Sequence, residues 1–311
     1  MYVFIVNPTA GNGRAKKIHA RLQKHEQYQS LNPICFYTEY VGHAEKIARQ
    51  LIHTHAHGEI KLIVVIGGDG TVHEVVNGLN GADIPISFIS GGSGNDFARG
   101  TSLIKSPTKM MAKINDANHL LAYWLGVYRN EHNVERQFVN CIGFGFDAVV
   151  AKIANQSKLK KLFNQFRLGT VIYLFSLIRA LLFYKPFSVT VEMDNETKTF
   201  HRCFFMTVNN HPYFGGGMKI NPRAINNERY FSVLVVDSVA KWKVFFLFAT
   251  VFLGKHLAFK EVSTFQARRI IVNTKHPILY QVDGEVYETK HCTMTKQPIP
   301  LKVKGSLLKT N

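Results

Sequence analysis

Short apolar runs alternate with helix-like stretches over the first third of the chain. The pattern predicts strands at residues 2–6, 34–37, 62–66 and 86–89, and helices at residues 15–25, 44–55 and 72–79. Strands of continuous apolar character that are separated by helices are typical of a parallel sheet covered on both faces. The first part of the chain is therefore predicted to be an α/β lobe.

The pattern changes after about residue 125 to an alternation of apolar and polar positions. Strands are predicted at residues 188–193, 204–208, 231–236 and 269–272, with Gly, Asn and Pro turns between such runs. A period of two with intervening turns indicates antiparallel strands, so the second lobe is expected to be rich in β-structure. Two helix-like stretches, 152–184 and 241–259, interrupt it.

Composition and charge narrow the class of protein. The 311 residues are 46% hydrophobic and 19% charged, which excludes wholesale disorder. The formal net charge of +17 indicates an anionic partner, for which nucleic acid, an anionic membrane face and phosphorylated small molecules all qualify. No helix-turn-helix, finger or RNP pattern is present, so a nucleic-acid partner is not expected.

The sequence predicts neither a membrane span nor a secreted protein. The longest clean apolar run, residues 244–253, is about half the length that a bilayer requires, and Lys241, Lys243 and Lys255 bracket it. The four cysteines lie far apart without a C-x-x-C pair, and the N-terminus lacks the features of a secretory signal. A cytoplasmic protein is therefore expected.

The strongest local signal is the turn after the strand at 62–66, Gly67-Gly68-Asp69-Gly70-Thr71, which a helical pattern follows at once. Glycines allow backbone amides to approach a phosphate at the positive end of a helix. A carboxylate there would repel the phosphate unless a divalent cation lay between them, so Asp69 suggests a metal–nucleotide complex. The alternative is a tight strand-to-helix turn with a capping aspartate.

Two more glycine loops follow predicted strands, at residues 7–14 (NPTAGNGR) and 90–99 (SGGSGNDFAR). Ligands of open α/β sheets bind at the carboxyl ends of the strands, where all three loops are expected. The P-loop G-x-x-x-x-G-K-[ST] is absent, which excludes the commonest class of NTPase. Residues 143–148 (GFGFDA) match the Rossmann pattern but follow the α/β lobe, so we predict a β-turn there.

Together these motifs resemble the bacterial diacylglycerol kinase-like lipid kinases, and the resemblance covers nearly the whole chain. GGDGT is shared with NAD kinases, whereas the GNDFAR segment is similar to the lipid kinase branch specifically. The motifs that carry the resemblance are Asn7-Pro8 with Gly11 and Gly13, Thr38-x-x-x-Gly42-His43-Ala44, Gly67-Gly68-Asp69-Gly70-Thr71, Gly94-Asn95-Asp96-Phe97-Ala98-Arg99, Tyr213-Phe214-Gly215-Gly216-Gly217 and Asp283-Gly284-Glu285.

The resemblance implies a fold of class α/β plus β. A phosphofructokinase/NAD kinase-like nucleotide lobe with a parallel sheet would comprise residues 1–125, rejoined by 296–311, and a β-sandwich lipid-binding lobe residues 126–295, with ATP between them. Ser93 stands where the family usually has threonine, and Gly91 where it has proline. The residues implied in nucleotide binding are Asn7, Pro8, Gly11, Gly13, Thr38, Gly67, Gly68, Asp69, Gly70, Thr71, Val72, His73, Ser93, Asn95 and Asp96.

The family's catalytic carboxylates map to Asp283 and Glu285. Phosphoryl transfer to an alcohol requires a carboxylate that can accept the hydroxyl proton, and the resemblance implies that this pair contains it, with Glu285 slightly favoured over Asp283. Asp69 would act through the metal. Without the resemblance, Asp-Gly is simply the turn of a hairpin.

A segment of the second lobe departs from the family's pattern, which holds a structural magnesium. Glu228 stands in place of the ligating aspartate, with the carbonyl groups of Ile225 and Tyr230 as the other implied ligands. Glutamate is one methylene longer, and Mg²⁺ tolerates displaced ligands poorly. Arg229 and Ser232 replace a glycine and an acid. The second metal and full activity are therefore left open.

The resemblance implies an ATP- and Mg²⁺-dependent lipid kinase of phospholipid metabolism, with diacylglycerol as the first acceptor to test. Basic residues beside apolar ones at 158–185 and 241–248 suit docking on the anionic inner face of a membrane, although residues 244–253 could equally be core. The alternatives are an NAD kinase-type enzyme with a soluble substrate and a non-catalytic nucleotide- or lipid-binding protein. The oligomeric state is left open, although members of the family are often dimers.

Overall fold

The computed structural model describes residues 1–56, 58–114, 120–156, 179, 181 and 183–307. Two compact units are present. The first comprises Met1–Leu125, Tyr213–Gly217 and Gln297–Asn311, and the second Gly126–Pro212 and Met218–Lys296. Most of the basic and apolar stretch predicted at 158–185 lies outside the described residues.

The first unit is the α/β lobe, and the helices and strands predicted between residues 2 and 89 are confirmed with small shifts at their ends. Its strands are β1 (Tyr2–Val6), β2 (Ile34–Tyr37), β3 (Leu62–Gly67), β4 (Ile86–Ser90), β5 (Leu120–Tyr123), β11 (Tyr213–Phe214) and β17 (Leu301–Lys304). Its helices are α1 (Ala10–Leu22), α2 (Glu26–Leu31), α3 (His43–Thr54), α4 (Asp69–Leu79), α5 (Asp96–Gly100) and α6 (Pro107–Ile114).

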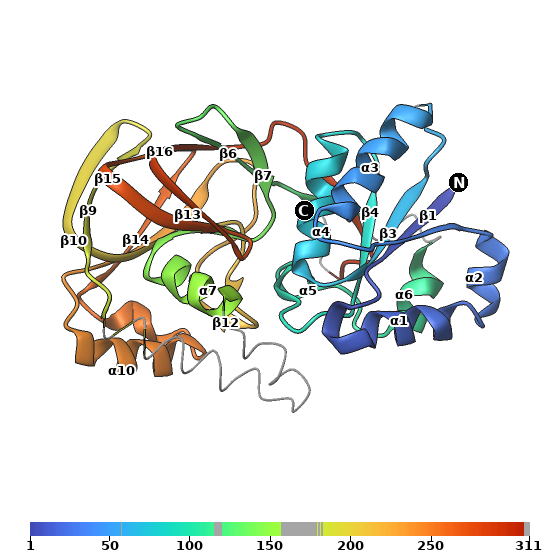
Figure 1. The fold of residues 1–311 in the computed structure, drawn as a ribbon, viewed down its shortest axis with the longest axis horizontal. Coiled ribbons are helices and arrows are strands. Elements are labelled where there is room, and N and C mark those ends of the chain that lie inside the picture. The colour runs from blue at the N-terminus through green and yellow to red at the C-terminus, as the bar shows by residue number, and fades with distance from the viewer. Residues whose placement is uncertain (57, 115–119, 157–178, 180, 182, 308–311) are drawn as a thin grey trace. The chain divides into compact units, whose positions relative to one another are not determined.

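The main sheet of the first unit has the order β2-β1-β3-β4-β17-β5, and helices lie around it (Figure 1). All pairs are parallel except β17–β5. Every residue of β3 is buried, as a continuous Val and Ile run at the centre of a covered sheet requires. The loops after β1, β3 and β4 therefore leave the same edge, at the carboxyl ends of neighbouring strands.

The second unit is built around antiparallel strands in the order β14-β13-β10-β8-β15-β16-β6-β7, with β9 pairing β10 and β15. Its strands are β6 (Gly126–Asn130), β7 (Glu135–Phe138), β8 (Cys141–Gly145), β9 (Phe187–Met193), β10 (Glu196–Asn209), β12 (Met218–Lys219), β13 (Phe231–Asp237), β14 (Val262–Ala267), β15 (Arg269–Val282) and β16 (Glu285–Lys296). Its helices are α7 (Phe146–Gln156), α10 (Lys241–Val251) and the 3₁₀ helix η1 (Lys255–Ala258).

The core of the second unit is formed by apolar side chains of these strands, including Phe144, Val191, Val233 and Tyr280. The four strands predicted here are confirmed, two of them within the longer strands β10 and β15. The β-turn predicted at residues 143–148 is wrong, because this segment is the junction where β8 passes directly into α7. Glycines at 143 and 145 are compatible with a turn and also with a strand in crowded surroundings. The segment is a strand because it pairs with both β10 and β15.

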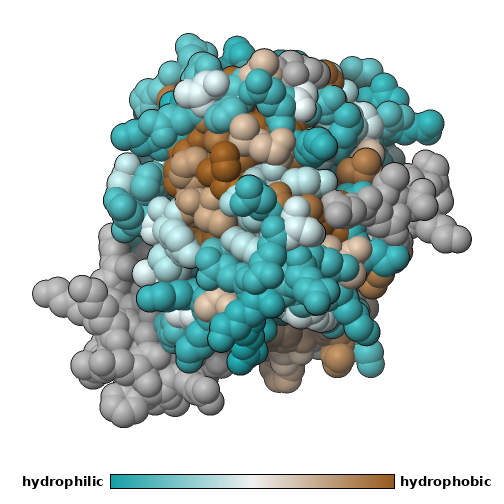
Figure 2. Space-filling model, turned by 90° about the vertical axis from the view of Figure 1, so that its right-hand side faces the viewer, coloured by the Kyte–Doolittle hydropathy of each residue, from teal (hydrophilic) through white to brown (hydrophobic). Residues whose placement is uncertain are grey.

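One face of the molecule carries mostly hydrophilic side chains (Figure 2). Figure 2 shows the molecule from the right-hand side of Figure 1, where hydrophilic side chains surround a smaller apolar area. Within the described residues, no helix has the length and apolar character needed to cross a bilayer.

Candidate active site

The three glycine loops predicted from the sequence meet in the first unit. The carbonyl oxygen of Gly67 accepts hydrogen bonds from the amides of Gly91 (2.7 Å) and Gly92 (2.9 Å). A Cβ atom on Gly92 would lie 2.6 Å from the Cα of Gly68, and one on Gly11 would collide with the carbonyl oxygen of Gly91. The loops thus approach so closely that only glycine fits at these positions, and their backbone groups are gathered at one place.

The first of these loops begins with an unusual backbone. Gly11, Asn12 and Gly13 all have positive φ, at +58°, +56° and +83°, so the start of α1 is a left-handed turn. Concave turns of successive amides can bind anions. The side chain of Asn7 ties this loop to the second one, because its Nδ2 donates to Thr71 Oγ1 at 3.2 Å.

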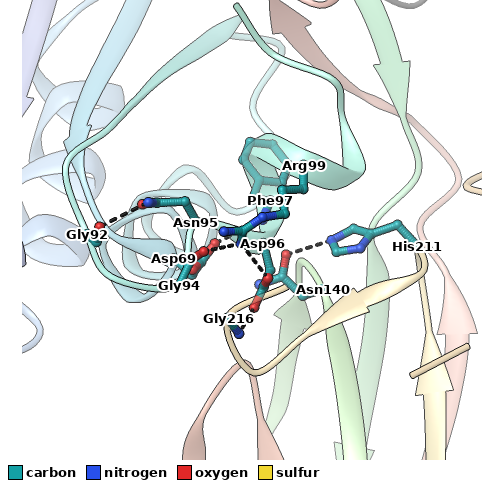
Figure 3. A network of polar contacts seen from close by, with 10 residues as sticks. All are labelled: Asp69, Gly92, Gly94, Asn95, Asp96, Phe97, Arg99, Asn140, His211 and Gly216. Carbon is teal, nitrogen blue, oxygen red and sulfur yellow. Dashed lines mark hydrogen bonds and ion pairs between the residues drawn. The ribbon is translucent and has the colours of Figure 1, made fainter. Parts of the chain in front are cut away.

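Asp69 lies among these loops as the first residue of α4 (Figure 3). Its Oδ1 accepts a hydrogen bond of 2.9 Å from the amide of Phe97, and a Cβ on Gly94 would come within 2.8 Å of Oδ2. The carboxylate is therefore held at the N-terminus of a helix with glycine backbone beside it. This is the arrangement in which a cation could join a carboxylate to phosphate oxygens.

Asp96 and Asn95, both predicted to bind nucleotide, make contacts that shape the third loop. Asp96 is buried, pairs with Arg99 through Oδ1 at 2.9 Å, and accepts from the amide of Gly216 through Oδ2 at 2.8 Å. Arg99 also donates to the carbonyl oxygen of Gly94. Asn95 has a φ of +56° and donates from Nδ2 to the Gly92 carbonyl at 2.9 Å. These side chains fix the loop and attach the glycine-rich segment 213–217 to the first unit (Figure 3).

The remaining predicted nucleotide residues of the first unit fall into two groups. Gly70, in the first turn of α4, and Ser93, on its loop, are exposed and Pro8 is half-buried, so a ligand can reach them. Thr38, Val72 and His73 are buried, so little of these residues is open to solvent. Thr38, for example, continues the sheet through its amide, which donates to the carbonyl of Val6 at 2.9 Å.

Glu74 is a supporting residue that the sequence did not single out. Its two carboxylate oxygens accept from the amides of Gly42 (2.9 Å) and Ala44 (3.0 Å) at the start of α3. A carboxylate on α4 thereby caps the neighbouring helix and fixes the G-H-A turn. The spacing of the two segments along the chain gives no sign that they pair.

In the second unit, Asp283 lies in the hairpin turn between β15 and β16 with a φ of +50°. Its Oδ2 accepts from the amide of Val139 at 2.7 Å, and its Oδ1 from those of Asn140 (2.7 Å) and Cys141 (3.1 Å). Three backbone donors engage both oxygens, so this carboxylate anchors the hairpin to the chain that leads into β8.

Glu285, two residues further on, has a different environment. Its Oε2 accepts a hydrogen bond of 2.5 Å from the hydroxyl of Tyr287, the next residue on the same face of β16. Burial and the neighbouring carboxylate both raise the pKa of Tyr287 above its ordinary value, so the hydroxyl keeps its proton and acts as the donor. Tyr287 was missed in the sequence, although its spacing of two from Glu285 on a strand was the available signal.

Buried polar groups lie close to Asp283 in the second unit. His211 contacts Asn140 Oδ1 through Nε2 at 2.8 Å, and burial lowers the pKa of His211 to about 4 (Figure 3). Lys296 donates to Asn210 Oδ1 at 2.7 Å and lies over the ring of Phe231, and burial lowers its pKa to about 7. His211 is therefore neutral at physiological pH and is suited to hydrogen bonding rather than to holding charge.

The loop predicted to hold a structural magnesium is closed by its own side chains. Asn227 donates from Nδ2 to the carbonyl oxygen of Ile225 at 2.9 Å and accepts from the amides of Arg229 (2.8 Å) and Tyr230 (2.9 Å). Glu228 is largely exposed and lies 4.0 Å from the Arg229 guanidinium. Across the described part of the chain, no three His, Cys, Asp or Glu side chains group as a metal site would require. The Ile225 carbonyl keeps a second lone pair, but the Arg229 guanidinium beside Glu228 disfavours a cation there, and no step below involves a metal at this loop.

Comparison with known proteins agrees with this arrangement. Residues 1–122 match the model of the diacylglycerol kinase catalytic domain, and residues 140–305 match that of the YegS C-terminal NAD kinase beta sandwich-like domain. YtlR of Bacillus subtilis (strain 168), which is named as a candidate lipid kinase, is 36% identical over 97% of this chain and 99% of its own. A diacylglycerol kinase of Mycobacterium tuberculosis (strain H37Rv) is 26% identical over 90% of this chain and 87% of its own.

Solved structures show the same fold. A crystal structure described as that of a diacylglycerol kinase from Bacillus anthracis str. Sterne superimposes with a TM-score of 0.70 at 19% identity, over 99% of this chain and 98% of its own. A second one from the same organism, a candidate diacylglycerol kinase, gives 0.76 at 22% identity with the same coverage. The NAD kinase-like two-lobe fold expected from the sequence is thus confirmed. The chain belongs to the bacterial diacylglycerol kinase-like lipid kinase family.

Proposed function

We propose that the protein transfers the γ-phosphate of ATP, bound with Mg²⁺, to a hydroxyl group of a membrane lipid, with diacylglycerol as the first acceptor to test. The observation that carries the proposal is the meeting of three glycine loops around the Asp69 carboxylate. Membership of a kinase family supports phosphoryl transfer, and the names of several relatives support a lipid acceptor.

The first unit would bind the nucleotide. The left-handed turn at residues 11–13 and the N-terminus of α4 present backbone amides to phosphate oxygens. Asp69 supplies the carboxylate that a magnesium–phosphate complex needs, since Mg²⁺ is commonly held by one or two carboxylates together with substrate phosphates. The ion, when bound, would neutralise charge on the transferring group.

The second unit would supply the proton acceptor. Glu285 would take the proton of the lipid hydroxyl as its oxygen attacks the γ-phosphorus and the bond to ADP breaks. We assign this role to Glu285 rather than Asp283, because three backbone amides already occupy the oxygens of Asp283. Glu285 accepts a hydrogen bond from Tyr287, and its side chain is half-exposed.

The proposal is tested with purified protein, labelled ATP and Mg²⁺. Label should appear in lipid extracts when vesicles contain diacylglycerol or another lipid alcohol, and NAD should remain unlabelled. Transfer to NAD instead would identify the soluble-substrate alternative. ATP binding without transfer to any acceptor would identify a non-catalytic binding protein.

Glu285→Gln tests the assignment of the proton acceptor. We expect kcat to fall about 10²- to 10⁴-fold, the usual contribution of a general base, with an unchanged melting temperature. Glu288→Gln is a matched control, since Glu288 lies on the same strand with a 60% exposed side chain. Equal activity of the two variants would remove Glu285 from the mechanism.

A further inference from the structure

Helix α10 in the second unit exposes large apolar side chains to solvent. Positions three, four and seven apart lie on one face of a helix, and five residues with this spacing form what we term the aromatic face. The aromatic face consists of Trp242 (62% exposed), Phe245 (50%), Phe246 (58%), Phe252 (51%) and Leu253 (69%), the last two just beyond the end of the helix.

The opposite side of α10 accounts for its packing. Val244, Leu247 and Val251 are buried and hold the helix against its own unit. Residues 244–253 are therefore partly core and partly surface. A surface helix normally turns polar residues to water, and an exposed apolar group of this size marks an interaction site.

The charge around the aromatic face is positive. Residues 241–260 contain Lys241, Lys243, Lys255 and Lys260 but no Asp or Glu. Lys243 forms an ion pair of 2.6 Å with Glu261, which still leaves the segment cationic. Lysines thus stand at both ends of the aromatic face, in a chain whose net charge is +17.

We propose that α10 docks the protein on an anionic lipid leaflet. The helix would lie in the plane of the interface, with the aromatic face among the acyl chains and Lys241 and Lys255 at the phosphate headgroups. A bilayer fits better than a protein groove, because aromatic and leucine side chains bordered by lysines are the composition of interfacial helices. Figure 1 shows α10 at one end of the second unit. The inference does not depend on the proposed kinase reaction, since docking needs no ATP.

The test is sedimentation of the protein with vesicles in the absence of ATP. Binding should be strong with phosphatidylglycerol–phosphatidylcholine vesicles, weaker with phosphatidylcholine alone, and reduced by salt, which screens lysine–headgroup attraction. Phe245→Ser/Phe246→Ser should lower the vesicle partition coefficient at least tenfold, and Lys241→Ala/Lys255→Ala several-fold at low salt only.

A matched control is Val41→Ser/Ile299→Ser, which removes exposed apolar side chains from the first unit and should leave vesicle binding unchanged. Quenching of Trp242 fluorescence by brominated lipids gives a second readout. Unchanged vesicle binding by folded Phe245→Ser/Phe246→Ser overturns the proposal, as does a change from dimer to monomer with vesicle binding intact, which would identify a face between copies. A protein that docks but phosphorylates nothing would refute the proposed function alone.

Discussion

The turns Asp69–Gly70 and Asp283–Gly284 have the same dipeptide sequence and opposite arrangements. In the first unit, Oδ1 of Asp69 accepts a hydrogen bond from the amide of Phe97, and the carboxylate lies beside backbone that only glycine can provide. In the second unit, both oxygens of Asp283 are taken up by three amides. The surroundings that the fold supplies, rather than the dipeptide, distinguish the two carboxylates. Asp69 lies at the start of a helix among glycine loops, whereas Asp283 is bound to backbone amides of another segment.

Asp147, at the start of α7, is a third carboxylate to compare with these two. The residue is half-buried with its Oδ1 shielded from solvent, and Gln281 donates to its Oδ2 at 3.2 Å. Burial raises the pKa of Asp147 to about 7, which this side-chain donor and nearby backbone amides offset only in part. A carboxylate with few donors in the interior thus becomes a weak acid.

The strongest way to break the comparison is Asp69→Asn. The variant keeps an oxygen for the Phe97 amide but loses the charge, so we expect kcat to fall about 10²- to 10³-fold with little change in melting temperature. Steady-state kinetics over a range of Mg²⁺ concentrations, with thermal unfolding in parallel, would measure both. An active variant, or one that fails to fold, would show that Asp69 is a structural cap like Asp283.

Asp283→Asn should have the reverse effect. Asparagine tolerates the positive φ at this position, so the change reports the lost acceptors rather than backbone strain. An amide group in place of one oxygen faces backbone donors, and we expect unfolding to be easier by about 3 kcal/mol. Urea denaturation measures this. Wild-type stability combined with lost turnover would instead make Asp283 the proton acceptor.

Much of the fold was predictable because its elements are locally encoded. The apolar run at 62–66 and the amphipathic spacing at 44–55 each indicate one element, and the structure has β3 and α3 there. The three glycine loops were predictable as a group, since parallel strands bring their carboxyl ends to one edge. The residues of the second loop could also be identified from the sequence, because its glycines and Asp69 are adjacent.

The supporting contacts were not predictable, because they join distant segments. Nothing near Asp283 in sequence indicates the amides of residues 139–141, and nothing near Gly42 indicates Glu74. The loop at 225–230 shows the same limit, since Asn227 closes it through hydrogen bonds that depend on the backbone path. The exposure of the aromatic face required knowing which side of α10 packs.

Asp147→Asn tests how the interior affects a carboxylate, through the pH dependence of the free energy of unfolding. Burial raises the pKa of Asp147 to about 7 in the folded protein, against an ordinary value of 3.8, so between these two values the folded state holds an additional proton. The free energy of unfolding therefore falls as pH rises through this window. The neutral asparagine avoids the free-energy cost of an ionised carboxylate in the interior. The variant should therefore be more stable than wild type by roughly 2 kcal/mol at pH 8.

The stability difference should shrink toward pH 5, where wild-type Asp147 is protonated in the folded state. Urea denaturation at the two pH values gives the comparison. If the variant is less stable than wild type at pH 8, Asp147 is ionised and stabilised by hydrogen-bond donors, as Asp283 is.

The smallest effect is expected for Tyr287→Phe, which removes the hydroxyl that donates to Glu285. The phenyl ring can keep its contact with Tyr280, whose ring centroid lies 5.6 Å away, so stability should change little. The hydroxyl fixes the position of the Glu285 carboxylate through its hydrogen bond, so its loss should lower kcat about tenfold with little change in KM. Tyr40→Phe, at a 53% exposed tyrosine of the first unit, serves as control. A purely structural Tyr287 would lower stability and leave kcat unchanged, and Glu285 would then act without help from its neighbour.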